Sequence, residues 1–224
     1  MPNRWGGFLE IPTDSDGDGV KEVYNPAQFA YVTAPGTKYL KAKLMNDIVI
    51  NDIDVVVTDG VAKVYDQYGK EVTDFSILTQ WHNGQDVIDG NTIDGDGHTV
   101  SGIYYDGTQA GESVGLIPVV GNTAEIRELT VANSVINADK GSAGAIAGSV
   151  ADKCGKAIKF NADTVEDTVE FNGKAKFGGI IGSVGYSALH MNDCISKTHG
   201  LFNDITGEAK VSRSISVGAY PFAD

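Results

Sequence analysis

An apolar segment bracketed by glycines occurs three times in the chain, as VGLIPVVG (residues 114–121), AGAIAGSV (143–150) and FGGIIGSV (177–184). We call these segments the glycine cassettes. With Gly115, Gly144 and Gly179 taken as equivalent, the steps between copies are 29 and 35 residues. Each cassette is followed by a polar turn and a short strand-like run. A repeat of this length predicts an array that stacks one coil of chain per repeat.

The cassettes also predict how the core is built. Glycine at the corner of a coil permits a bend and a close backbone approach, because it has no Cβ atom. Three cassette isoleucines are expected to stack as an inward ladder: Ile117, Ile146 and Ile181. The runs that follow supply a second ladder, made of Ile126 and Leu129, Ile158 and Phe160, and Leu189 and Met191. Each buried Leu or Ile contributes about 2 kcal/mol to folding.

Residues 88–107 have the pattern of one coil of a parallel β-helix, because Asp-Gly turns separate three-residue strands with β-branched interiors. We therefore predict an all-β fold, a short parallel β-helix in one domain. A β-hairpin insertion is expected at residues 55–80, which lack a glycine cassette. A β-sandwich is the alternative. Residues 1–224 are divided into an acidic loop and cap helix (1–37), first coils with the insertion (38–107) and repeat coils (108–224).

The cap helix is predicted at residues 25–32. Asn25 suits the N-cap, and Pro26 suits the first helical position, where the absent N–H of proline costs nothing. Phe29 belongs to the apolar stripe, and Pro35-Gly36 ends the helix. A helix this short does not persist alone, so it is expected to pack against the first coil.

A candidate calcium loop lies before this helix. Asp14, Asp16 and Asp18 alternate and Gly19 follows, as in the first half of an EF-hand loop, in which alternate side chains point at one cation. The second half departs from that pattern, because position twelve is Asn25 and not glutamate. The alternative is an acidic turn without metal. The expected Ca²⁺ ligands are Asp14, Asp16, Asp18, the carbonyl of Val20, and Glu22.

Composition limits the partners. The 224 residues include 30 acidic and 17 basic side chains, which give a net charge of −13 and a pI near 4.6. We expect no nucleic-acid partner, because phosphate contacts need clustered Lys and Arg. We also expect no membrane insertion, because no apolar run of about 18 residues is present. The start, MPNRW, lacks the apolar region of a signal peptide. The chain is then cytosolic or a segment of a longer secreted protein, and the uncapped strand-like run at 211–217 favours the segment.

The cysteines and histidines indicate no metal centre. Cys154 and Cys194 lie one per repeat, which leaves two alternatives open, a disulfide between stacked coils or two buried free thiols. No Cys/His spacing typical of zinc is present, and the four histidines are scattered singly.

The ordered set of motifs resembles bacterial surface proteins that carry GLUG-type repeats. The set comprises the helix at 25–32, LMNDI at 44–48, IDGDGHTVSGI at 93–103 and the glycine cassettes. The resemblance implies a right-handed parallel β-helix on a secreted or wall-attached bacterial protein, either an adhesin or part of a large surface or carbohydrate-active chain. Two features depart from the family pattern: Pro118 replaces a cassette glycine, and the insertion has no counterpart. No catalytic residues come with this family.

The β-helix fold also hosts polysaccharide lyases and glycoside hydrolases, so an active site must be sought. The densest acidic set is Asp89, Asp94, Asp96 and Asp106, with His98 among them. Asp-Gly pairs are also what tight turns require, and we favour turn chemistry for the acids and a hydrogen bond to a turn carbonyl for His98. No nucleophile motif surrounds the serines Ser101, Ser149 and Ser183.

Aromatic side chains in loops are the candidate ligand contacts. Tyr68, Trp81 and Tyr186 lie in expected loops, and Tyr104 and Tyr105 must point to opposite faces of a strand. We name Tyr68, Trp81 and Tyr105 as candidate ligand-binding residues. The function expected from the sequence is a non-catalytic extracellular module that binds a glycan or a cell-surface protein. The alternatives are a polysaccharide-active enzyme and a structural spacer.

Overall fold

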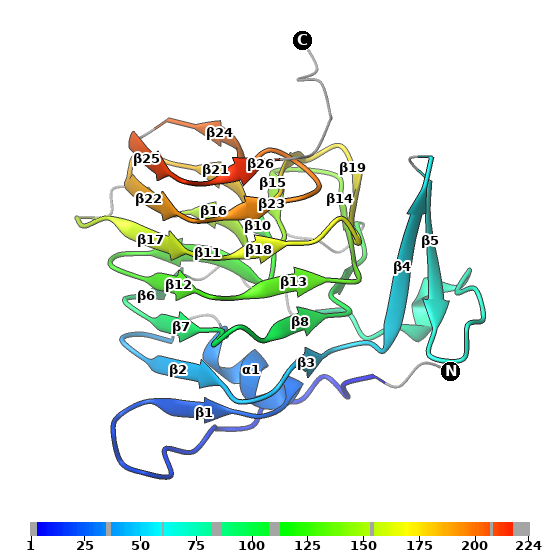
Figure 1. Cartoon of the computed structure of the whole chain (residues 1–224), viewed down its shortest axis with the longest axis horizontal. Coiled ribbons are helices and arrows are strands. Elements are labelled where there is room, and N and C mark those ends of the chain that lie inside the picture. The colour runs from blue at the N-terminus through cyan, green and yellow to red at the C-terminus, as the bar shows by residue number, and fades with distance from the viewer. Residues whose placement is uncertain are drawn as a thin grey trace.

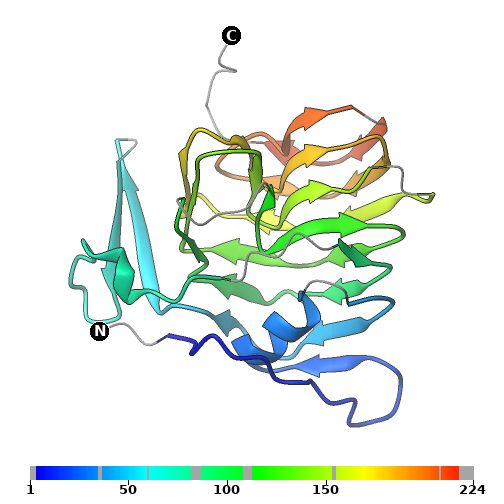
Figure 2. The ribbon, with the colours of Figure 1, turned by 180° about the vertical axis from the view of Figure 1, so that it is seen from behind.

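The computed structural model describes residues 4–34, 37–59, 61–81, 87–107, 113–152, 155–206 and 208–216. In these ranges, short parallel strands are stacked in layers, and helix α1 (Pro26–Val32) lies at the N-terminal end of the stack (Figure 1). A hairpin stands at the side of the stack, as the view from behind also shows (Figure 2).

Three sheets run along most of the stack. The seven-stranded sheet contains, in spatial order, β1 (Lys21–Val23), β2 (Lys41–Leu44), β7 (Thr92–Asp94), β12 (Glu125–Arg127), β17 (Ile158–Asn161), β22 (Ala188–Asn192) and β25 (Glu208–Ser212). The six-stranded sheet contains β3 (Ile48–Val49), β8 (Thr99–Ser101), β13 (Thr130–Ala132), β18 (Thr164–Val165), β23 (Ile195–Ser196) and β26 (Ile215–Ser216). The five-stranded sheet contains β6 (Val87–Asp89), β11 (Ile117–Gly121), β16 (Ala147–Val150), β21 (Ile181–Val184) and β24 (Phe202–Ile205).

Two shorter sheets occur only in the middle of the stack. One contains β9 (Tyr104–Tyr105), β14 (Ser134–Ala138) and β19 (Val169–Gly173), and the other contains β10 (Ser113–Val114), β15 (Ser142–Gly144) and β20 (Lys176–Gly178). We call one passage of the chain from the seven-stranded sheet back to the same sheet a circuit. In the middle circuits the chain visits all five sheets in turn, so β12 pairs in parallel with both β7 and β17. The prediction of an all-β fold with parallel sheets is confirmed, whereas the β-sandwich alternative requires antiparallel sheets.

One hydrophobic core fills the inside of the stack, and one predicted ladder lies within it. Ile126 pairs with Phe160, and Phe160 pairs with Met191, all fully or almost fully buried, as the sequence predicted. The ladder of cassette isoleucines is wrong at its middle step, because Ile117 pairs with Ala147 and not with Ile146.

The physical reason is the length of the cassette turn. Val114 pairs with Ala143 and Ile117 pairs with Ala147, so the first cassette has two residues between these paired positions, whereas the second has three. The third cassette has three as well, between Phe177 and Ile181. Ile146 therefore belongs to the turn, where its N–H donates to the carbonyl of Ile180. The second and third cassettes are in register throughout, with Ala143 opposite Phe177 and Ala147 opposite Ile181, so Gly144 pairs with Gly178 and not with Gly179.

The cassette glycines allow two sheets to pack back to back. A Cβ atom at Gly182 would lie 2.5 Å from both the backbone N of Ala143 and the carbonyl oxygen of Gly148. A Cβ atom at Gly148 would lie 2.4 Å from the backbone N of Val114. The sheet of β10, β15 and β20 can therefore approach the five-stranded sheet closely only because these positions carry no side chain.

Helix α1 closes the N-terminal end of the core, and its predicted position is confirmed. Asn25 is the N-cap and accepts the Gln28 N–H through Oδ1 at 3.0 Å, and Pro26 is the first helical residue. Phe29 is completely buried and stacks on Trp81, with 6.0 Å between ring centroids. Trp5 contacts the same indole at a centroid distance of 5.1 Å. Residues 35 and 36, where the helix was expected to end, lie outside the described ranges.

The hairpin insertion is also observed, with slightly wider bounds than predicted. Strands β4 (Ile53–Thr58) and β5 (Val61–Asp66) pair antiparallel, and a bridge between Tyr65 and Glu71 closes a second turn before the 3₁₀ segment η1 (Phe75–Ile77). The hairpin has a small core of its own, which packs on Tyr104 and Val135 of the stack.

Candidate functional site

The predicted calcium loop has the internal hydrogen bonds of a metal-binding turn. Asp14 accepts the Gly19 N–H through Oδ2 at 3.1 Å, and Asp18 accepts the Val20 N–H through Oδ1 at 2.8 Å. Gly19 has a φ of +86°, a conformation that strongly favours glycine. Ligand atoms of Asp14, Asp16 and Asp18 lie within 4.8 Å of one another, so this cluster can hold a metal ion.

One carboxylate oxygen of the loop lacks a partner. Oδ1 of Asp14 is buried and accepts no hydrogen bond, although a buried unpaired polar atom is costly. A cation at the cluster would supply the missing interaction, so the donor set fits Ca²⁺, a hard ion that prefers oxygen ligands. Of the other expected ligands, Glu22 forms the base of the loop, where its N–H donates to the Thr13 carbonyl and its carboxylate accepts from Ser15.

A second acidic cluster, also able to hold a metal by its spacing, lies on the seven-stranded sheet and consists of Asp94, Asp96 and Glu128. Its carboxylates already have cationic partners. Arg127 contacts Asp94 at 2.6 Å, and Lys43 contacts Asp96 at 2.9 Å. These ion pairs compensate the charge that a metal would otherwise balance, so the first cluster is the better candidate.

The turn interpretation is confirmed for Asp94 and Asp96, whereas Asp89 is the last residue of strand β6. Asp94 accepts the Asp96 N–H at 3.0 Å, Asp96 has a φ of +50° and Gly97 a φ of +79°. The prediction for His98 is wrong in its partner. The ring nitrogen Nδ1 contacts the carboxylate of Asp47 at 3.2 Å, whereas a turn carbonyl was predicted. Asp47 also accepts the Thr99 N–H, and this bond together with His98 lowers the pKa of Asp47.

Two of the three predicted aromatic ligand contacts are wrong. Trp81 is buried beneath the cap helix and donates its indole N–H to the Leu116 carbonyl at 2.9 Å. Tyr105 is completely buried and donates its hydroxyl to the Gly115 carbonyl. Both side chains are part of the hydrophobic core, because large apolar groups fill the space where the cap helix and the glycine cassettes meet. Tyr68 is 78% exposed on the hairpin insertion and remains accessible.

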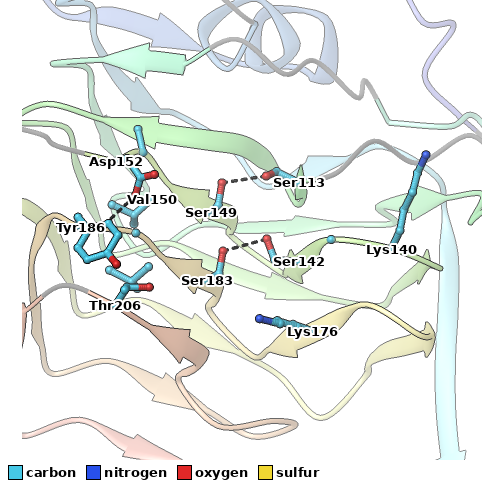
Figure 3. A pocket seen from close by; sticks show the side chains of 14 residues that line it. Ser113, Lys140, Ser142, Ser149, Val150, Asp152, Lys176, Ser183, Tyr186 and Thr206 are labelled. Carbon is cyan, nitrogen blue, oxygen red and sulfur yellow. Dashed lines mark hydrogen bonds between the residues drawn. The ribbon is translucent and has the colours of Figure 1, made fainter.

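A polar groove lies on the side of the stack, where the sheet of β10, β15 and β20 meets the five-stranded sheet (Figure 3). Its volume is about 570 Å³, within the range of ligand sites of 300–1,000 Å³. We call it the serine groove. Its lining comes from successive circuits, so the groove extends along the stack.

Two hydrogen-bonded serine pairs occupy the middle of the serine groove. Ser113 and Ser149 lie 2.8 Å apart, Oγ to Oγ, and Ser183 donates to Ser142 over 3.0 Å. Ser142 also donates toward the carbonyl of Gly148. Each pair joins the two sheets that meet in the groove. Each hydroxyl has one hydrogen, and these bonds use three of the four, so the row presents mainly acceptor lone pairs at fixed positions.

The ends of the groove carry larger polar side chains. Figure 3 shows Tyr186, Asp152 and Thr206 on one side of the serine pairs and Lys140 on the other, with Lys176 beside the Ser142–Ser183 pair. Tyr186 is 65% exposed, and its N–H donates to Asp152 Oδ1 at 2.8 Å. An exposed aromatic ring next to hydroxyl, amine and carboxylate groups is an arrangement that suits a sugar.

The described groove residues do not include the carboxyl pair of a glycoside hydrolase. A glycoside hydrolase uses two carboxyl groups across the scissile bond, and Asp152 is the one carboxylate among the described lining residues. One oxygen of Asp152 is engaged as a turn cap for Tyr186. The serines are paired with each other, and the described lining contains no histidine that could activate them. The arrangement fits binding better than catalysis.

Sequence reasoning missed the serine groove, although one signal was present. Ser149 and Ser183 follow a glycine at the same position of two cassettes, each before a valine, and were considered only as nucleophiles. The repeated serine marked an outward position on equivalent strands. The roles of Ser113, Ser142 and Lys176 could not be found in this way, since they depend on which sheets meet.

Cys194 does not line the serine groove. Cys194 has a free thiol that is completely buried, and burial raises its pKa to about 12. Cys154, its partner in the disulfide alternative, lies outside the described residues. Among the described residues, no helix reaches the length and apolar character that crossing a membrane requires.

Comparisons of the chain with models of protein families, with curated proteins and with solved structures found no match. The inferences that follow therefore depend on the residues and the geometry described above.

Proposed function

We propose that this chain is a non-catalytic carbohydrate-binding module of a secreted or cell-surface bacterial protein. Its fold in this proposal is a right-handed parallel β-helix of the kind that GLUG-type repeats imply. The parallel circuits, the cap helix and the cassette turns support the fold. The serine groove supports the binding role and is the single observation that carries it.

Three features of the serine groove suit a glycan. Paired hydroxyls offer acceptor lone pairs at fixed positions, which match the many hydroxyl donors of a saccharide. The exposed ring of Tyr186 provides an apolar face for a sugar ring. The contribution of several circuits gives an elongated site, which suits a chain of sugars. Asp152 is the one carboxylate among the described lining residues, which supports binding over hydrolysis.

Tyr186→Ala tests this role, with Tyr39→Ala as the matched control, because both tyrosines are exposed and Tyr39 does not line the groove. On a glycan array, Y186A is expected to lose about tenfold in affinity for the glycans that the wild type binds, and Y39A to keep full affinity. If the wild type binds no glycan, the module is a spacer. If the wild type releases shortened products from a polysaccharide, the enzyme alternative is correct.

We also propose that Ca²⁺ binds the acidic loop and stabilises the N-terminal end of the stack. Asp14, Asp16 and Asp18 would hold the ion, with the Val20 carbonyl and Glu22 as the remaining expected ligands. Extracellular modules bind calcium with dissociation constants of about 10⁻⁴–10⁻³ M. At 10 mM calcium, such a site would add about 1.4–2.7 kcal/mol to the free energy of unfolding.

The calcium proposal is tested by urea unfolding of the wild type, D16N and D167N in EDTA and in 10 mM CaCl₂. Asp167 is an exposed carboxylate outside both acidic clusters, so D167N is the control. Calcium is expected to stabilise the wild type and D167N but not D16N. Equal stability of the wild type in EDTA and in calcium would show that the loop is only a turn.

A further inference from the structure

The two serine pairs of the serine groove are copies of one unit, displaced by one circuit. Ser113 and Ser142 occupy paired positions on β10 and β15, and Ser149 and Ser183 occupy paired positions on β16 and β21. Neighbouring strands of a sheet lie about 4.8 Å apart, so the same arrangement of hydroxyls recurs at this step along the stack. We call each hydrogen-bonded serine pair a rung.

The rungs follow one another along the stack without a sideways shift, because neither wall of the groove changes register between these circuits. Figure 3 shows the two rungs one below the other, with Tyr186 to one side of them. The groove continues beyond the rungs, since its lining extends from Ser113 on β10 to Thr206, which follows β24. A ligand that contacts both rungs must therefore run along the stack and repeat at nearly the spacing of the strands.

The groups at the rungs determine what such a ligand must offer. Three of the four serine hydrogens are used in bonds within the protein, so the rungs mainly accept hydrogen bonds. The side chain of Tyr186 is 65% exposed beside the rungs and offers an apolar ring face. A ligand that uses both features carries hydroxyl donors along its edge at every step and has an apolar face as well.

We infer that the serine groove binds an extended β-1,4-linked glycan of hexopyranoses, with successive sugars at successive circuits. This inference rests on the proposed carbohydrate-binding function. When glucose, mannose or N-acetylglucosamine is joined in this way, both bonds of each ring are equatorial, so the chain is a straight ribbon. Each sugar of the ribbon advances nearly as far as one circuit of the stack, and hydroxyls line both of its edges.

Other linkages do not fit this arrangement. In α-1,4-linked and β-1,3-linked glucans, each sugar is turned relative to the preceding one, so the chain coils. A coiled chain that contacts the first rung turns away from the second. The inference therefore concerns the linkage of the glycan and does not depend on a net charge in the groove.

The test measures the binding of five hexasaccharides by calorimetry. Cellohexaose, mannohexaose and chitohexaose are β-1,4-linked, whereas maltohexaose is α-1,4-linked and laminarihexaose is β-1,3-linked. Cellohexaose, maltohexaose and laminarihexaose are uncharged glucose hexamers that differ in linkage alone. The proteins are the wild type, S149A, S183A, the double variant and S101A. Ser101 on β8 is the control, because it is half-buried on a strand, as Ser149 and Ser183 are, but lies outside the groove lining. Thermal melts establish that each variant is folded.

The wild type and S101A are expected to bind at least one β-1,4-linked hexasaccharide about tenfold more tightly than maltohexaose and laminarihexaose. Each rung substitution should weaken that binding about fivefold, and the double variant about twentyfold, through loss of hydrogen bonds to the ligand.

Three results would overturn the inference and leave the carbohydrate-binding role intact. They are equal binding of all five hexasaccharides or a preference for a coiled one, unchanged binding of the ribbon in the double variant, and binding of array glycans without any β-1,4-linked hexasaccharide. Binding of no glycan in this set or on the array would overturn both proposals.

Discussion

Replacement of Asp163 by asparagine should stabilise the protein by an amount that grows with pH. Asp163 is completely buried in the corner between β17 and β18. Its Oδ1 accepts the Leu129 N–H at 3.1 Å, whereas its Oδ2 has no partner. Burial raises the pKa of this carboxyl well above its ordinary value, and the carboxylates of Glu128 and Glu125 add to the effect.

The sign follows from proton binding. Above the ordinary carboxyl pKa, the unfolded chain releases the Asp163 proton and the folded chain keeps it, so the unfolded state binds fewer protons. The contribution of Asp163 to stability is therefore fully present below the unfolded pKa and is lost as pH rises toward the folded pKa. The steepest slope is about 1.4 kcal/mol per pH unit. Asparagine keeps the Oδ1 acceptor and has no proton to lose.

Urea unfolding of the wild type and D163N from pH 4.5 to pH 7.5 measures this difference. Burial also raises the pKa of Glu170 and lowers that of His199, but both groups are present in both proteins and cancel in the comparison. Asp167→Asn, at an exposed position two residues after the end of β18, should show no such slope. A free-energy difference between D163N and the wild type that stays constant with pH would refute the reasoning.

Two further substitutions test the packing and the cap. Gly182→Ala should lower the free energy of unfolding in urea by about 1–3 kcal/mol, because its Cβ would meet backbone atoms at 2.5 Å. Gly155→Ala is the control and should change it little, because no atom lies within 4 Å of its Cβ position. Equal losses in the two variants would disprove the close-packing argument. Asn25→Ala should cost about 1 kcal/mol through loss of the hydrogen bond to the Gln28 N–H, and an unchanged unfolding midpoint would show that Asn25 does not cap the helix.

Local chemistry made the cap and the hairpin predictable from the sequence. The Asn25-Pro26 pair determines the helix start through one side-chain hydrogen bond and one fixed φ angle, and both act within a few residues. The hairpin follows from Asp59-Gly60 between two apolar runs. The register of the cassettes was less predictable, because a difference of one residue in turn length moves Ile146 from the strand into the turn.

The candidate sites also differ in how far the local sequence predicts them. The acidic loop is contiguous, so its alternating carboxylates could be identified before the structure. The serine groove joins Ser113 to Ser149 and Ser142 to Ser183, residues 36 and 41 positions apart, and depends on which sheets pack together. Trp81 and Tyr105 were misjudged because no local pattern distinguishes an aromatic residue in an exposed loop from one that fills the core at a corner.

The length of each repeat determines whether it contributes to the groove wall made of β10, β15 and β20. Along the seven-stranded sheet, Ile93 pairs with Ile126, Ile126 with Phe160, and Phe160 with Met191, at steps of 33, 34 and 31 residues. Met191 then pairs with Val211 after 20 residues. In that last circuit the chain passes from β23 to β24 without strands in the two shorter sheets. The residues that the longer circuits add build β9 and β10 and their counterparts, and β10, β15 and β20 supply one wall of the serine groove. A chain of 20-residue circuits would keep the three long sheets and lose this wall. Repeat length therefore determines both the number of sheets and the presence of this groove wall.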